Sequence, residues 1–210
     1  MNKLYILVYI FLILLSSCKK ERKDTVITKT PFIIEYNNAN ILVTNINPDI
    51  IIDSWNVPKD FLLDINSDGQ NDFKFSVMNF YLYGGLILSN SELRIETLND
   101  DSYLLIDSIF PYVVLRGDTV ISQSLVDSLY PKVLSLGDTI GTNDDWRNGN
   151  FNILKSGQDI PPSNEYFYAG CWWGLDGKHI GIKYKNLLGW IKIGIPYNSS
   201  IKIYEFALSK

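Results

Sequence analysis

Apolar and polar side chains alternate with a period of two along most of this chain. The pattern is clearest in Phe73–Val77 (FKFSV), Ser91–Thr97 (SELRIET) and Gly189–Ile195 (GWIKIGI). Successive side chains of a β-strand point to opposite faces of the sheet, so such a segment buries one face and leaves the other in water. One-sided burial is typical of antiparallel sheets, and 46% of the residues are hydrophobic, which is enough for a core. The sequence therefore predicts an all-β domain.

Further strand-like segments are separated by short clusters of Asn, Asp, Gly and Ser, which favour turns. They are Phe32–Tyr36, Ile50–Ser54, Phe61–Ile65, Tyr112–Leu115, Tyr166–Trp172, His179–Tyr184 and Ser200–Leu208. Many short strands joined by turns predict an antiparallel β-sandwich, with a β-barrel as the alternative. Only Ser122–Lys132 has helical spacing, at Leu125, Val126 and Leu129, so at most one short helix is expected. Leu136–Pro162 has the least regular pattern and is expected to be a mobile loop.

The first eighteen residues have the pattern of an export signal. Lys3 precedes an uncharged apolar run, Leu4–Leu15, which is shorter than the roughly 20 residues of a membrane-spanning helix. The run leads into Leu15-Ser16-Ser17-Cys18, a tetrad that resembles the lipobox of bacterial lipoproteins. The resemblance implies that residues 1–17 are removed and that Cys18 carries acyl chains such as palmitate, which together anchor a protein stably. An ordinary secretory signal with an incidental cysteine is the alternative.

The rest of the chain divides into a tether and one domain. Residues 18–25 are charged and form a solvated tether, and residues 26–210 are long enough for a single all-β domain. The expected location is the cell envelope, with a lipid anchor in the outer membrane and either membrane face possible. The net charge is −4 and no Lys/Arg cluster occurs outside the tether, which argues against a nucleic-acid partner. Cys171 has no second cysteine for an intramolecular disulfide and is expected to be a buried small apolar residue.

The C-terminal part, from Tyr166 to Leu208, contains three short motifs. They are His179-Ile180-Gly181-Ile182, Gly189-Trp190-Ile191-Lys192-Ile193 and Ile201-Lys202-Ile203-Tyr204-Glu205-Phe206-Ala207. This order resembles uncharacterised outer-membrane lipoproteins of Bacteroidetes-type bacteria, although Leu188 stands where the commoner form has Tyr. The resemblance implies no known activity. It implies three final antiparallel strands, in which Trp190 and the isoleucines close the core.

The segment Asp64–Asp72 reads D-x-N-x-D-G-x-x-D. Ca²⁺ takes six to eight oxygen ligands, and here the side chains of Asp64, Asn66, Asp68 and Asp72 and the backbone carbonyl of Gln70 occupy ligand spacing. An EF-hand is excluded because position 12 is Phe75 and the flanking segments are strand-like. The segment resembles the nine-residue calcium loops of integrin-type propeller repeats, but a single copy implies no propeller. A structural calcium ion is predicted, and a polar hairpin turn is the alternative.

Catalytic motifs are absent from the sequence. His179 is the only histidine, and no G-x-S-x-G elbow, P-loop or zinc-type His cluster occurs. A pair of carboxylates would suffice for a glycoside hydrolase, but sequence alone does not pair the candidates across a cleft. These candidates are Glu35, Glu96, Glu165 and Glu205. An enzyme is therefore kept only as an alternative, and no catalytic residue is assigned.

Two classes of binding function remain. The first is a non-catalytic envelope protein that binds another protein or helps to assemble a complex. The second is a glycan-binding module of a polysaccharide-uptake or adhesion system, because flat aromatic rings suit sugar rings. Its candidate platform consists of Trp172, Trp173 and Trp146, and Trp55 and many tyrosines add to the aromatic content. Neighbours in a strand face opposite ways, so one of Trp172 and Trp173 is expected in the core.

Overall fold

A computed structural model describes residues 32–36, 39–54, 57–82, 88–116, 119–158, 165–196 and 199–210. All of them belong to one compact unit, Pro31–Lys210. The predicted signal peptide, the tether, Cys18 and Trp55 lie outside the described residues. No helix in the described part of the chain is long and apolar enough to cross a bilayer.

All regular elements of the described residues are β-strands, which confirms the all-β prediction. They are β1 (Phe32–Ile33), β2 (Ile41–Asp53), β3 (Lys59–Leu63), β4 (Phe73–Leu82), β5 (Leu88–Thr97), β6 (Ser102–Arg116), β7 (Thr119–Pro131), β8 (Val133–Leu134), β9 (Thr139–Ile140), β10 (Trp146–Arg147), β11 (Asn150–Gln158), β12 (Glu165–Ala169), β13 (Lys178–Tyr184), β14 (Leu187–Gly194) and β15 (Ser200–Ser209).

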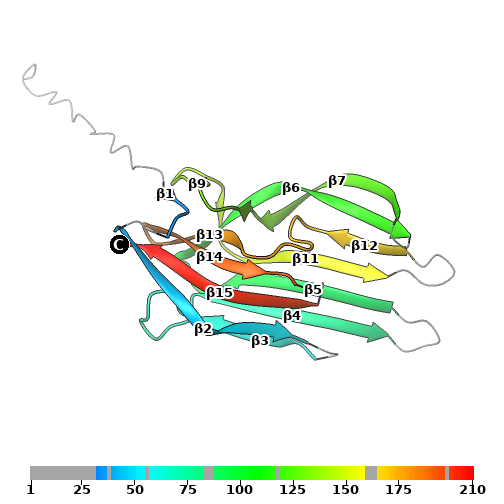
Figure 1. Ribbon diagram of the computed structural model, residues 1–210, viewed down its shortest axis with the longest axis horizontal. Coiled ribbons are helices and arrows are strands. Elements are labelled where there is room, and N and C mark those ends of the chain that lie inside the picture. The colour runs from blue at the N-terminus through cyan, green and yellow to red at the C-terminus, as the bar shows by residue number, and fades with distance from the viewer. Residues whose placement is uncertain are drawn as a thin grey trace, which may run out of the picture. The chain divides into compact units, whose positions relative to one another are not determined.

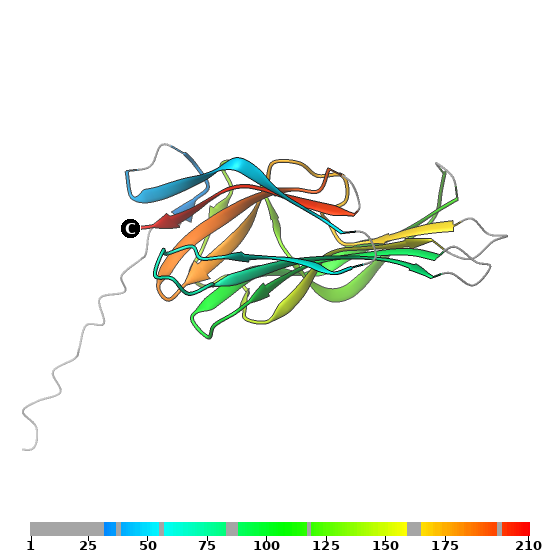
Figure 2. The same ribbon diagram turned by 90° about the horizontal axis from the view of Figure 1, so that it is seen from below.

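Thirteen strands form one antiparallel sheet that folds over on itself at the long strand β6 (Figure 1). Its order is β2-β15-β14-β13-β6-β12-β11-β5-β4-β3, with β7 and β10 paired to β6 and β8 paired to β13. The first residues of β6, Ser102–Leu104, pair with β13, whereas Tyr112–Arg116 pair with β12. Strand β6 therefore runs from one layer into the other, and Figure 2 shows the two layers packed as a sandwich. The described strands do not close the sheet into a barrel.

The alternating apolar residues fill the space between the two layers. The members of this main core include Phe73, Phe75, Val77, Leu93, Ile95, Ile180, Ile182, Ile191, Ile193, Ile201 and Ile203, all of them fully buried. Burial of one such side chain stabilises a fold by about 1.5–3 kcal/mol. These are the positions that the period of two marks in the sequence, so the main core was predictable.

A second, smaller core lies on the opposite face of the layer formed by β13, β14 and β15. Trp190 is fully buried there with Ile34, Leu134 and Ile140, which come from the segments around β1, β8 and β9. The prediction that Trp190 closes the same core as Ile191 and Ile193 is therefore wrong. Trp190 is adjacent to Ile191 in a strand, so its side chain must point to the other face.

One local prediction is wrong, and the short helix that was allowed for does not form, because pairing between distant segments overrides local pattern. Ser122–Lys132, with its helical spacing, lies almost entirely in strand β7, which pairs with β6 along its length. The expected loop Leu136–Pro162 contains β9, β10 and the nine-residue β11. A β-bulge between Asn152 and Leu154 interrupts the alternation of β11, so both Ile153 and Leu154 are buried and the sequence lacks a clean period of two.

Candidate functional site

Three of the four carboxylates considered for glycoside hydrolysis lie on separate strands and bind cations. Glu96 of β5 pairs with Lys74, Glu165 of β12 with Arg116, and Glu205 of β15 with Lys192. Glu35 follows β1. Glycoside hydrolysis needs two carboxyl groups about 5–10 Å apart across a bound sugar. Each of the three is thus paired with a cation on its own part of the sheet, and no catalytic role is assigned to any of them.

His179 and Cys171 are both held in forms that do not favour catalysis. The His179 imidazole is buried in contact with the edge of Trp190, with ring centroids 4.9 Å apart. Its burial, with a further contribution from the Lys192 ammonium, lowers the pKa of His179 to about 4. Burial and the Asp107 carboxylate raise the pKa of the Cys171 thiol, so little of the nucleophilic thiolate forms. Near neutral pH His179 is therefore a neutral, buried imidazole, and Cys171 is mainly a protonated thiol.

The predicted calcium loop connects β3 to β4, whose ends pair at Leu63 and Phe73. The Asp64 carboxylate accepts hydrogen bonds from the backbone N–H groups of Asn66 (3.2 Å), Ser67 (2.7 Å) and Gly69 (2.8 Å). Ser67 and Gly69 have positive φ, at 60° and 87°, which curls the chain around Asp64. Burial on its own would raise the pKa of Asp64, but the backbone hydrogen bonds lower it below its ordinary value. Asp64 is therefore held as a carboxylate at the centre of the loop.

Asn66 and Asp68 continue this network toward the tip. The side-chain oxygen of Asn66 accepts from the N–H of Asp68 at 2.8 Å, and Asp68 Oδ1 accepts from the N–H of Gln70 at 2.8 Å. Asn66 Nδ2 also donates to Asp68 Oδ2 at 3.1 Å. The Gln70 residue is exposed. These contacts are also those of a self-capped polar turn, which was the alternative prediction.

Asp72 closes the loop from inside the protein. It is only 1% exposed, and its two carboxylate oxygens accept from the N–H of Ile65 at 3.0 Å and from Asn99 Nδ2 at 2.8 Å. Burial raises the pKa of Asp72, and the negative charges of Asp64 and Asp68 add to that rise. A cation beside this trio of carboxylates would stabilise the charged form of Asp72.

A grouping of His, Cys, Asp and Glu side chains that would hold a metal ion by themselves does not occur among the described residues. Ca²⁺ also accepts amide and backbone carbonyl oxygens, and Asn66 and Gln70 supply those in the sequence pattern. Calcium binding by this loop therefore stays a prediction.

The three tryptophans of the predicted glycan platform lie in different surroundings. Trp172 is fully buried in the main core, and its indole N–H donates to the Pro131 carbonyl at 2.7 Å. Trp173 is 44% exposed and stacks on Tyr168, with ring centroids 4.5 Å apart. Trp146 of β10 is half-buried against the second core and donates to the Gly141 carbonyl at 2.9 Å. Only Trp173 of the three thus offers a large exposed ring. One of Trp172 and Trp173 lies in the core as expected, but both residues follow the end of β12 at Ala169 and lie in a turn, so strand alternation is not the reason.

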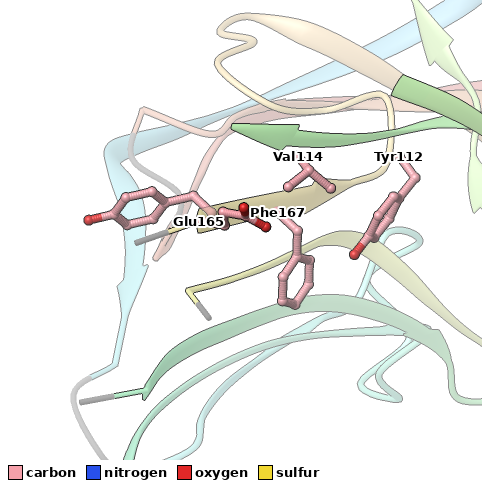
Figure 3. A pocket seen from close by; sticks show the side chains of 5 residues that line it. Tyr112, Val114, Glu165 and Phe167 are labelled. Carbon is pink, nitrogen blue, oxygen red and sulfur yellow. The ribbon is translucent and has the colours of Figure 1, made fainter. Parts of the chain in front are cut away.

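A hollow that the sequence did not mark lies on β6 and β12, and we call it the β6–β12 hollow. It is lined by Tyr112, Val114, Glu165, Tyr166 and Phe167 and has a volume of about 160 Å³ (Figure 3). The rings of Tyr112 and Phe167 stack with centroids 5.9 Å apart and planes inclined by 23°. The Glu165 carboxylate beside them binds Arg116. The lining of the hollow therefore consists of stacked aromatic rings with an ion pair beside them.

The sequence indicated the strands that carry the residues of this hollow, but it did not indicate the hollow itself. Tyr112–Leu115 and Tyr166–Trp172 were both predicted as strands. The first contains one aromatic residue, Tyr112, and the second contains four, Tyr166, Phe167, Tyr168 and Trp172. Strands β6 and β12 are separated by about fifty residues, and nothing local shows that they pair. Comparison with known proteins adds no assignment to either the loop or the hollow. No protein-family model matches this chain, and neither does any curated protein or solved structure.

Proposed function

We propose that this chain is a lipid-anchored protein of the bacterial cell envelope, whose β-sandwich binds another envelope component without catalysing a reaction. The observation that carries the binding role is a group of exposed apolar side chains on three neighbouring strands. They are Ile109 of β6 (55% exposed), Val120 (54%), Ile121 (44%) and Leu129 (40%) of β7, and Tyr166 of β12 (37%). Val120 stands opposite Leu115 and Ile109 opposite Asp127, so apolar side chains are exposed at both ends of the β6–β7 pair, and these strands are candidates for an interaction surface.

Strand β7 adds to this argument as an edge strand. Among the described residues it pairs with β6 only, so no second strand is hydrogen-bonded to its other side. Thr119–Tyr130 contains no Lys, Arg or Pro, the residues that usually protect an edge from pairing. An extended segment of a partner protein can add to such an edge as a further strand. A protein partner is therefore the first candidate.

Crosslinking in cells tests the protein-binding role. A photo-crosslinking amino acid at Val120 is expected to capture a specific envelope protein, because Val120 lies on the exposed edge strand β7. The matched control carries the same amino acid at Leu62, which is 48% exposed on β3, away from β6 and β7, and is expected to capture nothing specific. Metabolic labelling with a fatty-acid analogue is expected to mark the wild type, and Cys18→Ala is expected to abolish both the label and the crosslink.

The labelling result tests the lipid anchor, and the crosslinking result tests the interaction surface on β7. Equal labelling of wild type and Cys18→Ala would contradict the lipid anchor. Equal products from Val120 and Leu62, or none from Val120, would contradict the interaction surface on β7 while leaving the anchor intact.

A glycan-binding module of an uptake or adhesion system is the second candidate. It is supported by the aromatic wall of the β6–β12 hollow, where the rings of Tyr112 and Phe167 stack. Flat rings pack against the C–H faces of sugars, and polar groups at their edges bind hydroxyls.

We also propose that Asp64, Asn66, Asp68, Asp72 and the Gln70 carbonyl hold a structural calcium ion. The support is the burial of Asp72 beside two other carboxylates, which is unfavourable without a positive charge. In this role the ion would join the β3–β4 connection to the turn after β5, where Asn99 binds Asp72.

Calcium is expected to stabilise the full chain, purified in detergent, against thermal unfolding. An ion that binds only the folded state adds about 2.7 kcal/mol at a hundredfold excess over Kd. For a chain of this size that raises the unfolding midpoint by about 5–10 °C relative to chelator. Asp68→Ala removes one carboxylate of the exposed tip and is expected to erase the difference, whereas Asp100→Ala in the next turn is expected to keep it. A wild-type midpoint that is the same with calcium and with chelator would leave the loop as a polar turn only.

A further inference from the structure

We propose that the β6–β12 hollow binds a neutral saccharide, one sugar ring at a time. The proposal rests on the non-catalytic binding role given above and adds a ligand class and a site to it. It also moves the glycan site away from Trp172, Trp173 and Trp146.

Strand register places Tyr112, Val114, Glu165 and Phe167 on one face of the sheet. Directly opposite residues of antiparallel strands share a face, and here Glu165 lies opposite Arg116, Phe167 opposite Val114, and Ala169 opposite Tyr112. Figure 3 shows the side chains of Tyr112, Val114, Glu165 and Phe167 gathered on that side. Ala169, between the larger neighbours, is small. The result is an aromatic and aliphatic floor with an ion pair at one end.

Residues that can form hydrogen bonds lie on the same face of the sheet, on the strands at either side of this floor. On β7, Ser122 lies opposite Val114 and Ser124 lies opposite Tyr112, and both serines are exposed. On the other side, Gly157 of β11 lies opposite Phe167, and Asn90 of β5 lies opposite Gly157. The floor is thus bordered by hydroxyl and amide groups, which both donate and accept hydrogen bonds.

Gly157 holds the Phe167 ring in place. A Cβ at position 157 would stand 2.4 Å from the Phe167 ring and 2.3 Å from Asn90 Oδ1, so only glycine leaves room for this ring against β11. The Phe167 ring also stacks on Tyr112. Contacts on two sides restrict its rotamers, and a ring that is already ordered loses little entropy when a ligand packs on it.

Charged groups around the hollow are paired with groups of opposite charge. Glu165 binds Arg116, and Glu92, in the next row of the same face, binds Arg94 and also Lys155, the latter at 3.1 Å. An ionic ligand would have to break one of these pairs, whereas hydroxyl groups bond to carboxylate and guanidinium together. A neutral sugar, with apolar C–H faces and a rim of hydroxyls, therefore matches this surface better than an anion or a cation does.

The size of the hollow limits how much of a glycan it takes. Its volume of about 160 Å³ is below the about 300–1,000 Å³ of sites for drug-sized ligands. It fits one ring, and its open position on the sheet leaves the rest of a chain free to extend along β6 and β7. This is the arrangement of a protein that recognises units of a longer polysaccharide.

Calorimetric titration of the full chain in detergent tests the proposal. The probes are cello-, xylo-, manno- and malto-oligosaccharides as neutral ligands, and polygalacturonate and heparin as charged ones. At least one neutral probe is expected to bind. Phe167→Ala is expected to raise its Kd about tenfold, because stacking on an aromatic ring is lost. Phe167→Tyr keeps the ring and is expected to keep the affinity, which separates loss of the ring from loss of the fold.

Trp173→Ala is the matched control, because it removes an exposed aromatic ring outside the hollow. It is expected to leave the affinity unchanged. The proposal is overturned if no neutral probe binds at its solubility limit, if only the charged probes bind, or if Trp173→Ala weakens binding as much as Phe167→Ala. Fatty-acid labelling through Cys18 and capture of a protein from Val120 do not depend on these results, so failure of the saccharide site and failure of the proposed function are distinguishable.

Discussion

Trp172→Ala is expected to lower the free energy of unfolding by about 3–5 kcal/mol, the usual cost of removing a large aromatic side chain from a packed core. Trp172 is fully buried in the turn between β12 and β13, among residues of both layers. The substitution also removes the indole donor of the Pro131 carbonyl, which lies in a buried residue. Domains of this kind are stable by about 5–15 kcal/mol, so the variant is expected to keep only part of its stability.

Trp173→Ala is the control for this experiment, because it changes the same residue type one position away. Trp173 is 44% exposed, and its ring contact is the stack on Tyr168. Its loss is expected to cost about 0.5–1.5 kcal/mol. Urea unfolding followed by circular dichroism gives both free energies, provided that the m-values stay equal. Equal losses for the two variants would contradict the assignment of Trp172 to the core and of Trp173 to the surface.

Acid is expected to destabilise the protein through His179. The pKa of His179 is about 4 in the folded state, against about 6.5 in the unfolded chain. Above pH ~6.5 the imidazole is neutral in both states and has no effect on stability. Below that pH the unfolded state binds a proton that the folded state excludes, so stability falls between pH ~6.5 and ~4, by up to about 3 kcal/mol. The surrounding charges are Lys192 and Lys178, which lower the pKa, and Glu205, which raises it.

His179→Phe isolates this effect. Phenylalanine keeps a ring against Trp190 but does not titrate, so the loss of stability between pH ~6.5 and ~4 is expected to be smaller in the variant. Asp72 acts in the opposite direction. Its pKa is raised in the folded state, so the folded state binds a proton more readily than the unfolded chain does, and Asp72 stabilises the fold as pH falls. Asp72 is present in both proteins, so its contribution is the same in each. The difference between the two unfolding curves therefore reports His179 alone. Parallel curves over this pH range would show that His179 already binds protons in the folded state as it does in the unfolded chain.

Local features of the fold could be predicted from the sequence. The alternation in Phe73–Val77, Ser91–Thr97 and Gly189–Ile195 identified strands and most of the main core. The segment Asp64–Asp72 was predicted as a calcium loop between two strands, and it does connect β3 to β4, with the Asp64 carboxylate accepting hydrogen bonds from the loop's own backbone. Asn99, which also binds Asp72, was missed because it lies in a different turn.

Features that depend on distant pairing were not predictable. Strand β7 has helical spacing, and β11 has a bulge, so both gain their conformation from neighbours that are remote in the sequence. The β6–β12 hollow depends on the same kind of pairing, since its two aromatic rings come from strands about fifty residues apart.

By itself, then, the sequence determined that this chain forms strands and which side of many strands is apolar, because the period of two is a local property of an extended backbone. Tertiary structure decided which strands pair, and through this pairing it decided where exposed rings and charges meet. Backbone hydrogen bonds between strands are the same for nearly every residue type, so they do not select a partner. The choice comes from the joint burial of many side chains, such as Trp172 between the layers and Trp190 in the second core, and that burial exists only in the assembled fold.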